Sequence, residues 1–279
     1  MDLSAAPCLA LACGPRAGQG GVPDHRGGPL ERFVVAPGCP SGGGVTVRFR
    51  HADPVWAAFP ELSAGVLYAA GVDAPADTRR RAAGYTDRAV ARLARASEGE
   101  FPEVLAWRRT FSRMGVKPTQ YRSASESLLR RLRKEGALPR IHPLVDLCNA
   151  VSVAYAVPVA VLDVDRITGP LLEVRPARGD ETYTAFGGGV ERPAPGEVTF
   201  VDSAGRAHAR RWTHRQSGHS AVGAHTGRVL VVAEAMHDGG AEAVAEVLKT
   251  VEEEVAAHWA ATTATAVLTP AAPEFVFGH

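Results

Sequence analysis

Residues 143–163 read PLVDLCNAVSVAYAVPVAVLD, and this stretch decides the fold. The part from Pro143 to Tyr155 is apolar on nearly every side of a helical wheel, and Pro143 suits the first turn of a helix, so we expect a buried helix. Pro158 closes that segment, and Val159–Asp163 has the length and branching of a buried strand. A buried helix followed directly by a buried strand indicates a mixed α/β domain.

Working outward from this stretch, the sequence predicts mostly helices before it and mostly strands after it. The expected upstream helices are 74–96, 101–114 and 125–134, and the last of them stops at Gly136. A half-buried strand at 45–51 and a short helix and strand within 60–72 precede them. The expected downstream strands are 171–176, 181–185, 197–202, 207–212 and 229–234, followed by a helix over 240–262. The predicted fold class is therefore α/β of the mixed α+β kind, with a helical first half and a strand-rich second half.

The composition divides the chain into three parts. Residues 1–44 are dense in Gly, Pro and Ala without periodicity, which predicts a disordered head. Residues 45–262 form one predicted domain, and 263–279 form a predicted C-terminal tail. Three of the four cysteines fall in the head, which argues against a disulfide framework and favours a reducing, cytoplasmic setting. The head lacks the basic start of a signal peptide, and no apolar run reaches the length of about 18 residues that a membrane span needs.

The charged residues are unevenly distributed along the chain, although the net charge is only +1. Residues 79–140 carry 16 Lys and Arg against 6 Asp and Glu, whereas the rest of the chain is acidic. Such a segment suits contact with a polyanion, and a solvated helix face is the alternative interpretation.

Routine motif searches exclude several enzyme classes. The sequence holds no GxSxG elbow, no Walker loop, no HExxH and no CxxC pair. His214, His219 and His225 lie close together, but their spacing fits neither a helical nor a strand face, so we expect loop histidines, no metal and no cofactor.

Polar residues inside apolar runs are more informative because a buried polar group needs a partner. Asp146 and Asn149 share one face of the expected buried helix, where they either cap a neighbouring loop or border a pocket. Asp163 and Glu234 each end an apolar strand, a common place for ligand-binding groups. Each residue also has a structural alternative. Asp163 could begin a turn, and Glu234 could form an ion pair with an arginine of 209–216.

Three segments resemble freestanding B3/B4-domain proteins, which are relatives of the editing module in the β subunit of bacterial phenylalanyl-tRNA synthetase. The resemblance spans residues 101–236 and rests on three motifs in the family's order. These motifs are PLVD-x-x-N-x-V from Pro143, Pro-x4-Asp-x-Asp-x-Ile-x-Gly from Pro158, and R-R-W-x-x-R-Q from Arg210. The resemblance implies a B3/B4-like fold and a protein that hydrolyses mis-aminoacylated tRNA in trans.

Site residues follow from the same resemblance. It implies that Arg215 or Gln216, together with backbone N–H groups, holds the ester carbonyl while Glu234 holds the α-ammonium or the side chain. The implied pocket residues are Asn149, Asp146, Asp163, Ala160 and Trp212, and the implied tRNA contacts are Arg122, Arg130, Arg131 and Lys134. Ala160 stands where the synthetase module has a histidine, so a substrate other than a tyrosyl ester is expected. An aminoacyl ester is already activated, which agrees with the missing nucleophile motif.

Two other functions stay open at this stage. One is a module that binds an amino acid or a tRNA end without turnover, which the absent histidine suggests. The other is a hydrolase of small esters or peptides. The sequence leaves open the amino acid, the tRNA and the oligomeric state.

Overall fold

The stretch 143–163 folds as helix α5 (Pro143–Tyr155) and strand β4 (Val159–Asp163), with the predicted bounds. The structure, a computed structural model, describes residues 34–35 and 46–278. These residues all belong to the second of the chain's two units, 1–31 and 32–279. The predicted head at 1–44 lies outside the described residues, apart from β1 (Val34–Val35).

Strand β4 is the edge of a four-stranded antiparallel sheet with the order β13-β3-β12-β4. The other members are β3 (Ser63–Ala70), β12 (Arg228–Ala235) and β13 (Thr262–Leu268). Because side chains alternate along a strand, Ala160 and Leu162 point to one face of this sheet and Val161 and Asp163 to the other. Ala160 and Leu162 lie on the face that packs against the larger sheet.

A second, larger sheet has the order β1-β14-β2-β5-β8-β9-β6-β7. Its strands after β1 are β2 (Thr46–His51), β5 (Leu171–Pro176), β6 (Thr182–Thr184), β7 (Val190–Glu191), β8 (Val198–Asp202), β9 (Arg206–Ala207) and β14 (Glu274–Gly278). A separate hairpin joins β10 (Ala209–Arg210) to β11 (Arg215–Gln216). The parallel pair of β2 and β5 joins segments more than 100 residues apart in the chain.

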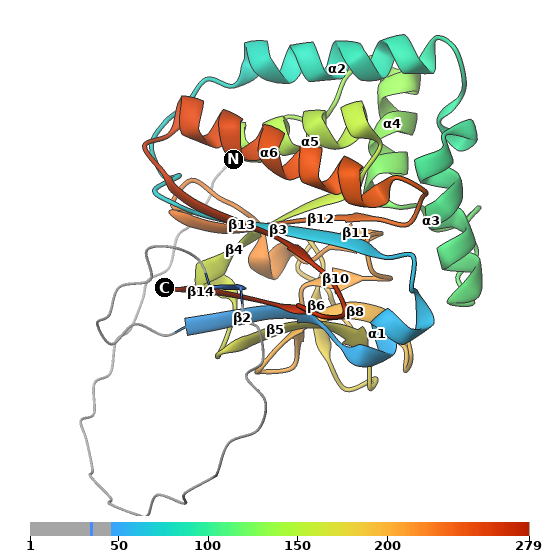
Figure 1. The fold of residues 1–279 in the computed structure, drawn as a ribbon, viewed down its shortest axis with the longest axis vertical. Coiled ribbons are helices and arrows are strands. Elements are labelled where there is room, and N and C mark those ends of the chain that lie inside the picture. Colours follow the sequence, from blue (N-terminus) through green and yellow to red (C-terminus); the bar gives the residue numbers. More distant parts are fainter. Residues whose placement is uncertain (1–33, 36–45, 279) are drawn as a thin grey trace, which may run out of the picture. The chain divides into compact units, whose positions relative to one another are not determined.

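Helices cover one face of the four-stranded sheet, and the larger sheet lies on its other face (Figure 1). The remaining helices are α1 (Asp53–Ala58), α2 (Arg79–Leu93), α3 (Pro102–Arg113), α4 (Ala124–Glu135) and α6 (Gly240–His258), with short 3₁₀ turns η1 (Glu98–Glu100), η2 (Val164–Arg166) and η3 (Gly218–Ser220). None of the helices in the described ranges has the length and apolar character that a membrane crossing requires.

The two sheets enclose one of the hydrophobic cores. Phe49 and Leu172 of the larger sheet pack there with Val66, Leu162 and Val232 of the smaller one, and all five are buried. The opposite face of the smaller sheet packs on α5 and α6 through a second cluster. The mixed α/β class, with helices mainly in the first half and strands mainly in the second, is thereby confirmed.

The predicted C-terminal tail at 263–279 is wrong for the described residues. These residues contribute β13, which pairs with β3 along its length, and β14, which lies between β1 and β2 in the larger sheet. The alternating sequence TTATAVL from Thr262 fits an edge strand, and without it one side of β3 would expose unpaired backbone groups. Residues at 207–212, predicted as one strand, instead form parts of β9 and β10 and then turn at Arg211.

Candidate functional site

A cavity of about 70 Å³ lies at one end of the core between the two sheets. Its walls come from β4, β8, β12, the hairpin β10–β11 and the start of α4. The lining residues are Ala124, Pro158, Val159, Ala160, Leu162, Phe200, His208, Ala209, Trp212, Thr213, Arg215, Gln216, Val232 and Glu234. The lining is mostly apolar with a few polar groups, which is the usual character of a small-molecule site.

Glu234 is a buried carboxylate in this cavity, with 2% of its surface exposed. Its Oε1 atom accepts hydrogen bonds from His51 Nε2 at 2.6 Å and from Trp212 Nε1 at 2.8 Å. Within the described part of the chain, no hydrogen bond reaches Oε2. Two ring N–H donors hold Glu234 in place of the arginine that the structural alternative offered, so one oxygen of the carboxylate is left for a ligand.

Trp212 reaches Glu234 from a turn with unusual backbone geometry. Arg211 and Trp212 have φ values of 48° and 60°, in the left-handed region that ordinary residues avoid at a cost of about 1–3 kcal/mol each. Phe59 and Trp107 hold the Trp212 ring edge-on, with centroid distances of 5.1 and 5.3 Å. Glu197 fixes the start of the turn, because its Oε1 accepts from Arg210 Nε at 2.7 Å and from the Arg211 backbone N–H at 2.8 Å.

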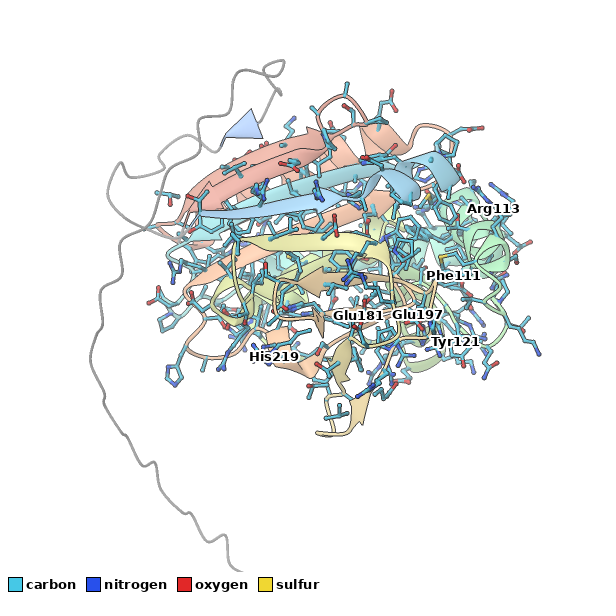
Figure 2. All side chains as sticks on the ribbon, turned by 90° about the horizontal axis from the view of Figure 1, so that it is seen from below. Phe111, Arg113, Tyr121, Glu181, Glu197 and His219 are labelled. Atoms are coloured by element: carbon cyan, nitrogen blue, oxygen red, sulfur yellow. The ribbon has the colours of Figure 1, made fainter. Side chains whose placement is uncertain are left out.

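The turn is joined to the start of α4 beside the cavity. The backbone N–H of Ala124 donates to the Thr213 carbonyl at 2.7 Å, and His214 Nδ1 donates to the Arg122 carbonyl at 2.7 Å. Tyr121 packs edge-on against His214, with a centroid distance of 5.2 Å. Figure 2 shows Tyr121 and His219 on opposite sides of Glu197 in its view of this region.

Arg215 and Gln216 both line the cavity but differ in what they can still bind. Gln216 Nε2 donates to the carbonyls of Val161 at 2.8 Å and Ser220 at 3.2 Å, so both of its amide hydrogens are used. Arg215 Nη2 donates to both oxygens of Glu191, at 2.8 and 2.7 Å, while its Nε is buried without a partner. The geometry therefore leaves Arg215, and not Gln216, with a donor available to a ligand.

Known proteins share sequence and structural similarity with this chain. The family model described as B3/4 domain matches residues 106–256, which is more than half of the chain and includes all of the cavity lining. The chain belongs to the B3/4 domain family. Among solved structures, an N-terminal fragment of the phenylalanyl-tRNA synthetase β subunit from Pyrococcus horikoshii is similar, with 10% identity and a TM-score of 0.44. The match covers 84% of this chain and 53% of that one, so the chain spans about half the length of that fragment. No curated protein matches the chain.

Of the predicted pocket residues in this B3/4 domain, Ala160 and Trp212 line the cavity. Asp163 does not line the cavity, and its side chain lies on the face of β4 opposite Leu162. Its Oδ1 accepts from the Asp165 backbone N–H at 3.0 Å and its Oδ2 from Thr226 Oγ1 at 2.7 Å. This is the turn role that the sequence offered as the alternative.

Asp146 and Asn149 also lie outside the cavity lining. Asp146 Oδ1 accepts from the backbone N–H groups of Ile141 at 2.8 Å and His142 at 3.3 Å. It therefore stabilises the loop before α5, as the capping alternative predicts. Asn149 is half-buried on the same helix, whose neighbours include α2 and α4.

The predicted tRNA-binding cations are mostly engaged in ion pairs. Arg122 lies 3.3 Å from Glu126, Arg131 lies 2.8 Å from Glu135, and Arg130 lies 3.5 Å from Glu98. The hydrogen bond from Arg133 holds the pKa of Glu98 below its ordinary value, against the effect of burial. Lys134 is exposed and has no ion pair among the described residues.

Sequence reasoning missed two histidines at this site. His51 ends the alternating strand β2 on its buried side, a signal that could have identified it as a core residue in need of a partner. His208 lines the cavity and is fully buried, yet nothing in the surrounding AHARR distinguishes it from a surface histidine. The described residues contain no group of three or more His, Cys, Asp or Glu placed to hold a metal ion.

Proposed function

We propose that this B3/4-domain protein hydrolyses the ester bond of mis-aminoacylated tRNA in trans. The observation that carries the proposal is the buried Glu234 carboxylate, held at one oxygen by His51 and Trp212 and unpaired at the other. A buried carboxyl oxygen without a partner needs a hydrogen-bond donor, and every aminoacyl ester carries an α-ammonium group that can donate one. The family membership adds support, because synthetase relatives of this domain edit aminoacyl-tRNA.

The cavity can supply the rest of an ester-hydrolysis site with few side chains. The ester is already activated, so correct placement of a water molecule and stabilisation of the developing oxyanion account for much of the rate. Arg215 Nε and Thr213 Oγ1 are buried without partners at the cavity, and we assign them to the carbonyl oxygen. Gln216 has the role of positioning β11 against β4.

The tRNA body would lie on the basic segment 79–140, where α4 begins at the cavity and ends among exposed cations. Lys134 and Arg109 are exposed, and neither has an ion pair in the described part of the chain. Phosphate contacts of this kind position a nucleic acid without reading its sequence. They would bring the aminoacylated 3′ end to the cavity beside Ala124.

The decisive experiment measures the release of radiolabelled amino acid from a panel of mischarged tRNAs, with and without the protein. We expect fast release from at least one mischarged tRNA and no release from the correctly charged ones. A matched panel of aminoacyl ethyl esters shows whether the tRNA is needed. Hydrolysis of the free esters alone would identify a small-ester hydrolase instead.

A non-catalytic binding module is the second candidate, and one observation favours it. Both amide hydrogens of Gln216 and the Nη2 group of Arg215 are already used within the protein, which leaves few donors for an oxyanion. Retention of aminoacyl-tRNA on the protein without release of amino acid would support this function and contradict the hydrolase.

A further inference from the structure

His208 is a buried titratable residue at the cavity that the proposed function has not yet used. It is 0% exposed, and its backbone is fixed by hydrogen bonds to Phe200 and Ser217 at 2.8 Å each. Neither of its ring nitrogens makes an aligned hydrogen bond within the protein. Unsatisfied buried donors and acceptors are rare in proteins, and each is a reason to look for a ligand or a bound water.

Asp202 is the one acidic group within ion-pair distance of the His208 ring among the described residues. Its Oδ2 atom lies 3.3 Å from His208 Nε2, and it is itself buried. The Asp202 carboxylate accepts three backbone N–H groups, from Ala204, Arg206 and Thr168, at 2.9–3.0 Å. Burial tends to raise the pKa of Asp202, but the His208 ring and these N–H groups together hold it below its ordinary value.

A fixed carboxylate beside one nitrogen of a histidine sets the tautomer of the ring. If Nε2 carries the proton toward Asp202, then Nδ1 keeps a lone pair and no protein group uses it. His208 lines the cavity but its ring is 0% exposed, so a water reaches Nδ1 only when the bound substrate opens this wall, and the lone pair is then suited to accept its proton. Asp202 would also stabilise the imidazolium ion once it forms.

We propose that His208 is the general base of the site and that Asp202 is its positioning residue, an inference that rests on the proposed deacylase function. In the step, the oxygen of a cavity water forms a bond to the ester carbonyl carbon while its proton passes to His208 Nδ1. The carbonyl oxygen becomes an oxyanion beside Arg215 and Thr213. The carbon–oxygen bond to the ribose then breaks, and the ribose oxygen takes up the proton from His208. The products are a free amino acid and an intact tRNA, so no other reactant is required.

Other titratable and charged groups lie close to His208. His219 is the nearest other titratable ring, with a centroid distance of 5.9 Å, and Arg206 Nη1 lies 3.4 Å from His219 Nε2. Burial lowers the pKa of His219, and the charge of Arg206 lowers it further. Arg215 and Glu234 share the cavity with His208.

The first test needs no substrate. Nitrogen-15 NMR of histidine-labelled protein at neutral pH distinguishes the two neutral tautomers, with the His208 signals assigned by their loss in His208→Gln. We expect His208 to be protonated at Nε2 and unprotonated at Nδ1. The opposite tautomer, or a permanently charged ring, would overturn the proposal whatever the activity of the protein.

The second test is kinetic and uses the tRNA that the wild-type protein deacylates fastest. His208→Gln should lower kcat on the order of 10²-fold with KM changed less than about threefold, because a general base acts in the chemical step. Asp202→Asn should also lower kcat, but by a smaller factor than His208→Gln does.

His225→Gln is the matched control, since the same change is made at an exposed histidine outside the cavity lining and should leave kcat unchanged. His208→Ala should regain activity with added imidazole, which a purely structural role cannot produce. Full activity in a folded His208→Gln protein would remove this inference and leave the deacylase function standing. A wild-type protein inactive on every substrate would overturn both.

Discussion

Glu234 shows how a single buried charge organises the site. A carboxylate of this kind is tolerated in a core only when hydrogen bonds replace its lost hydration, and here His51 and Trp212 supply two of them. Both donors come from segments remote from β12 in the sequence. The interaction therefore ties the larger sheet, the hairpin turn and the smaller sheet to one oxygen atom.

Replacing Glu234 by Gln keeps the size of the side chain and removes its charge. If Glu234 binds the α-ammonium group, the variant should lose at least about tenfold in deacylation, consistent with a charge-assisted contact of ~1.5–3 kcal/mol. Glu246→Gln on the exposed side of α6 is the matched control and should retain full activity. An unchanged rate in folded Glu234→Gln would exclude Glu234 from substrate binding.

Ala160 predicts the selectivity of the pocket. Its methyl group cannot hydrogen-bond a phenol, so tyrosine esterified to the phenylalanine tRNA should be hydrolysed more slowly than another misacylated species. Ala160→His should raise the rate on the tyrosyl ester relative to that species by about tenfold, whereas Ala160→Leu, a change of size alone, should not. Initial rates measured on both substrates decide this, and a tyrosyl ester that is fastest with the wild type would contradict it.

At the residue scale, the sequence predicted which polar residues are buried better than it predicted their partners. Asp146 and Asp163 follow the structural alternatives, since each accepts from a local backbone N–H group and Asp163 also accepts from the Thr226 hydroxyl. The β4 alternation places Asp163 on the face opposite Ala160 and Leu162, but it could not by itself exclude Asp163, because Val159 has the same parity and lines the cavity. His208 could not have been found, since its environment depends on a hairpin whose backbone no local pattern predicts.

At the scale of the elements, a helix with capping residues at both ends is specified by its own local sequence. Helix α4 is capped at both ends. The hydroxyl of its N-cap Ser123 accepts from the Glu126 backbone N–H at 3.3 Å, and its C-cap Gly136 has a φ of 73°. The sequence predicted this helix as 125–134, within one residue at each end, and its stop signal was Gly136. The strands at 207–212 were predicted poorly, because their conformation depends on Glu197 and on Trp212 packing.

A pair of glycine substitutions tests this account of the helices. Gly136→Ala should destabilise the protein by about 1–2 kcal/mol, because a side chain is strained at positive φ even though nothing else lies near the new methyl group. Gly84→Ala, inside α2 and also in open space, should stabilise it by about 0.5–1 kcal/mol. Urea unfolding of both variants checks the signs, and equal effects would refute the backbone explanation.

On the scale of the whole molecule, the C-terminal residues are part of the fold. Deleting residues 262–279 removes β13 and β14, which include the buried Phe275 and Phe277, so we expect a protein that aggregates or unfolds. Deleting residues 1–18, an equal length whose composition predicts no contribution to a core, should leave the thermal midpoint nearly unchanged. A stable, soluble C-terminal deletion would contradict this role of the two strands.

The uneven charge of the chain predicts how a polyanion should bind. Affinity for tRNA should fall steeply with salt, and Lys134→Glu should weaken binding and reduce the salt slope without changing which amino acid is removed. Lys249→Glu on α6, outside the basic segment, is the matched charge reversal and should have a smaller effect. Binding that does not vary with salt would favour the solvated-face interpretation of residues 79–140.

The hydrogen bond from Gln216 to Val161 has a consequence for self-association. Strand β4 is the open edge of the four-stranded sheet, and an edge with free carbonyl groups can accept a strand from another molecule. Gln216 occupies the Val161 carbonyl at 2.8 Å, in the middle of that edge. The same side chain that forms part of the cavity wall thus also occupies an edge carbonyl, and we expect Gln216→Ala to lower solubility by allowing intermolecular strand pairing.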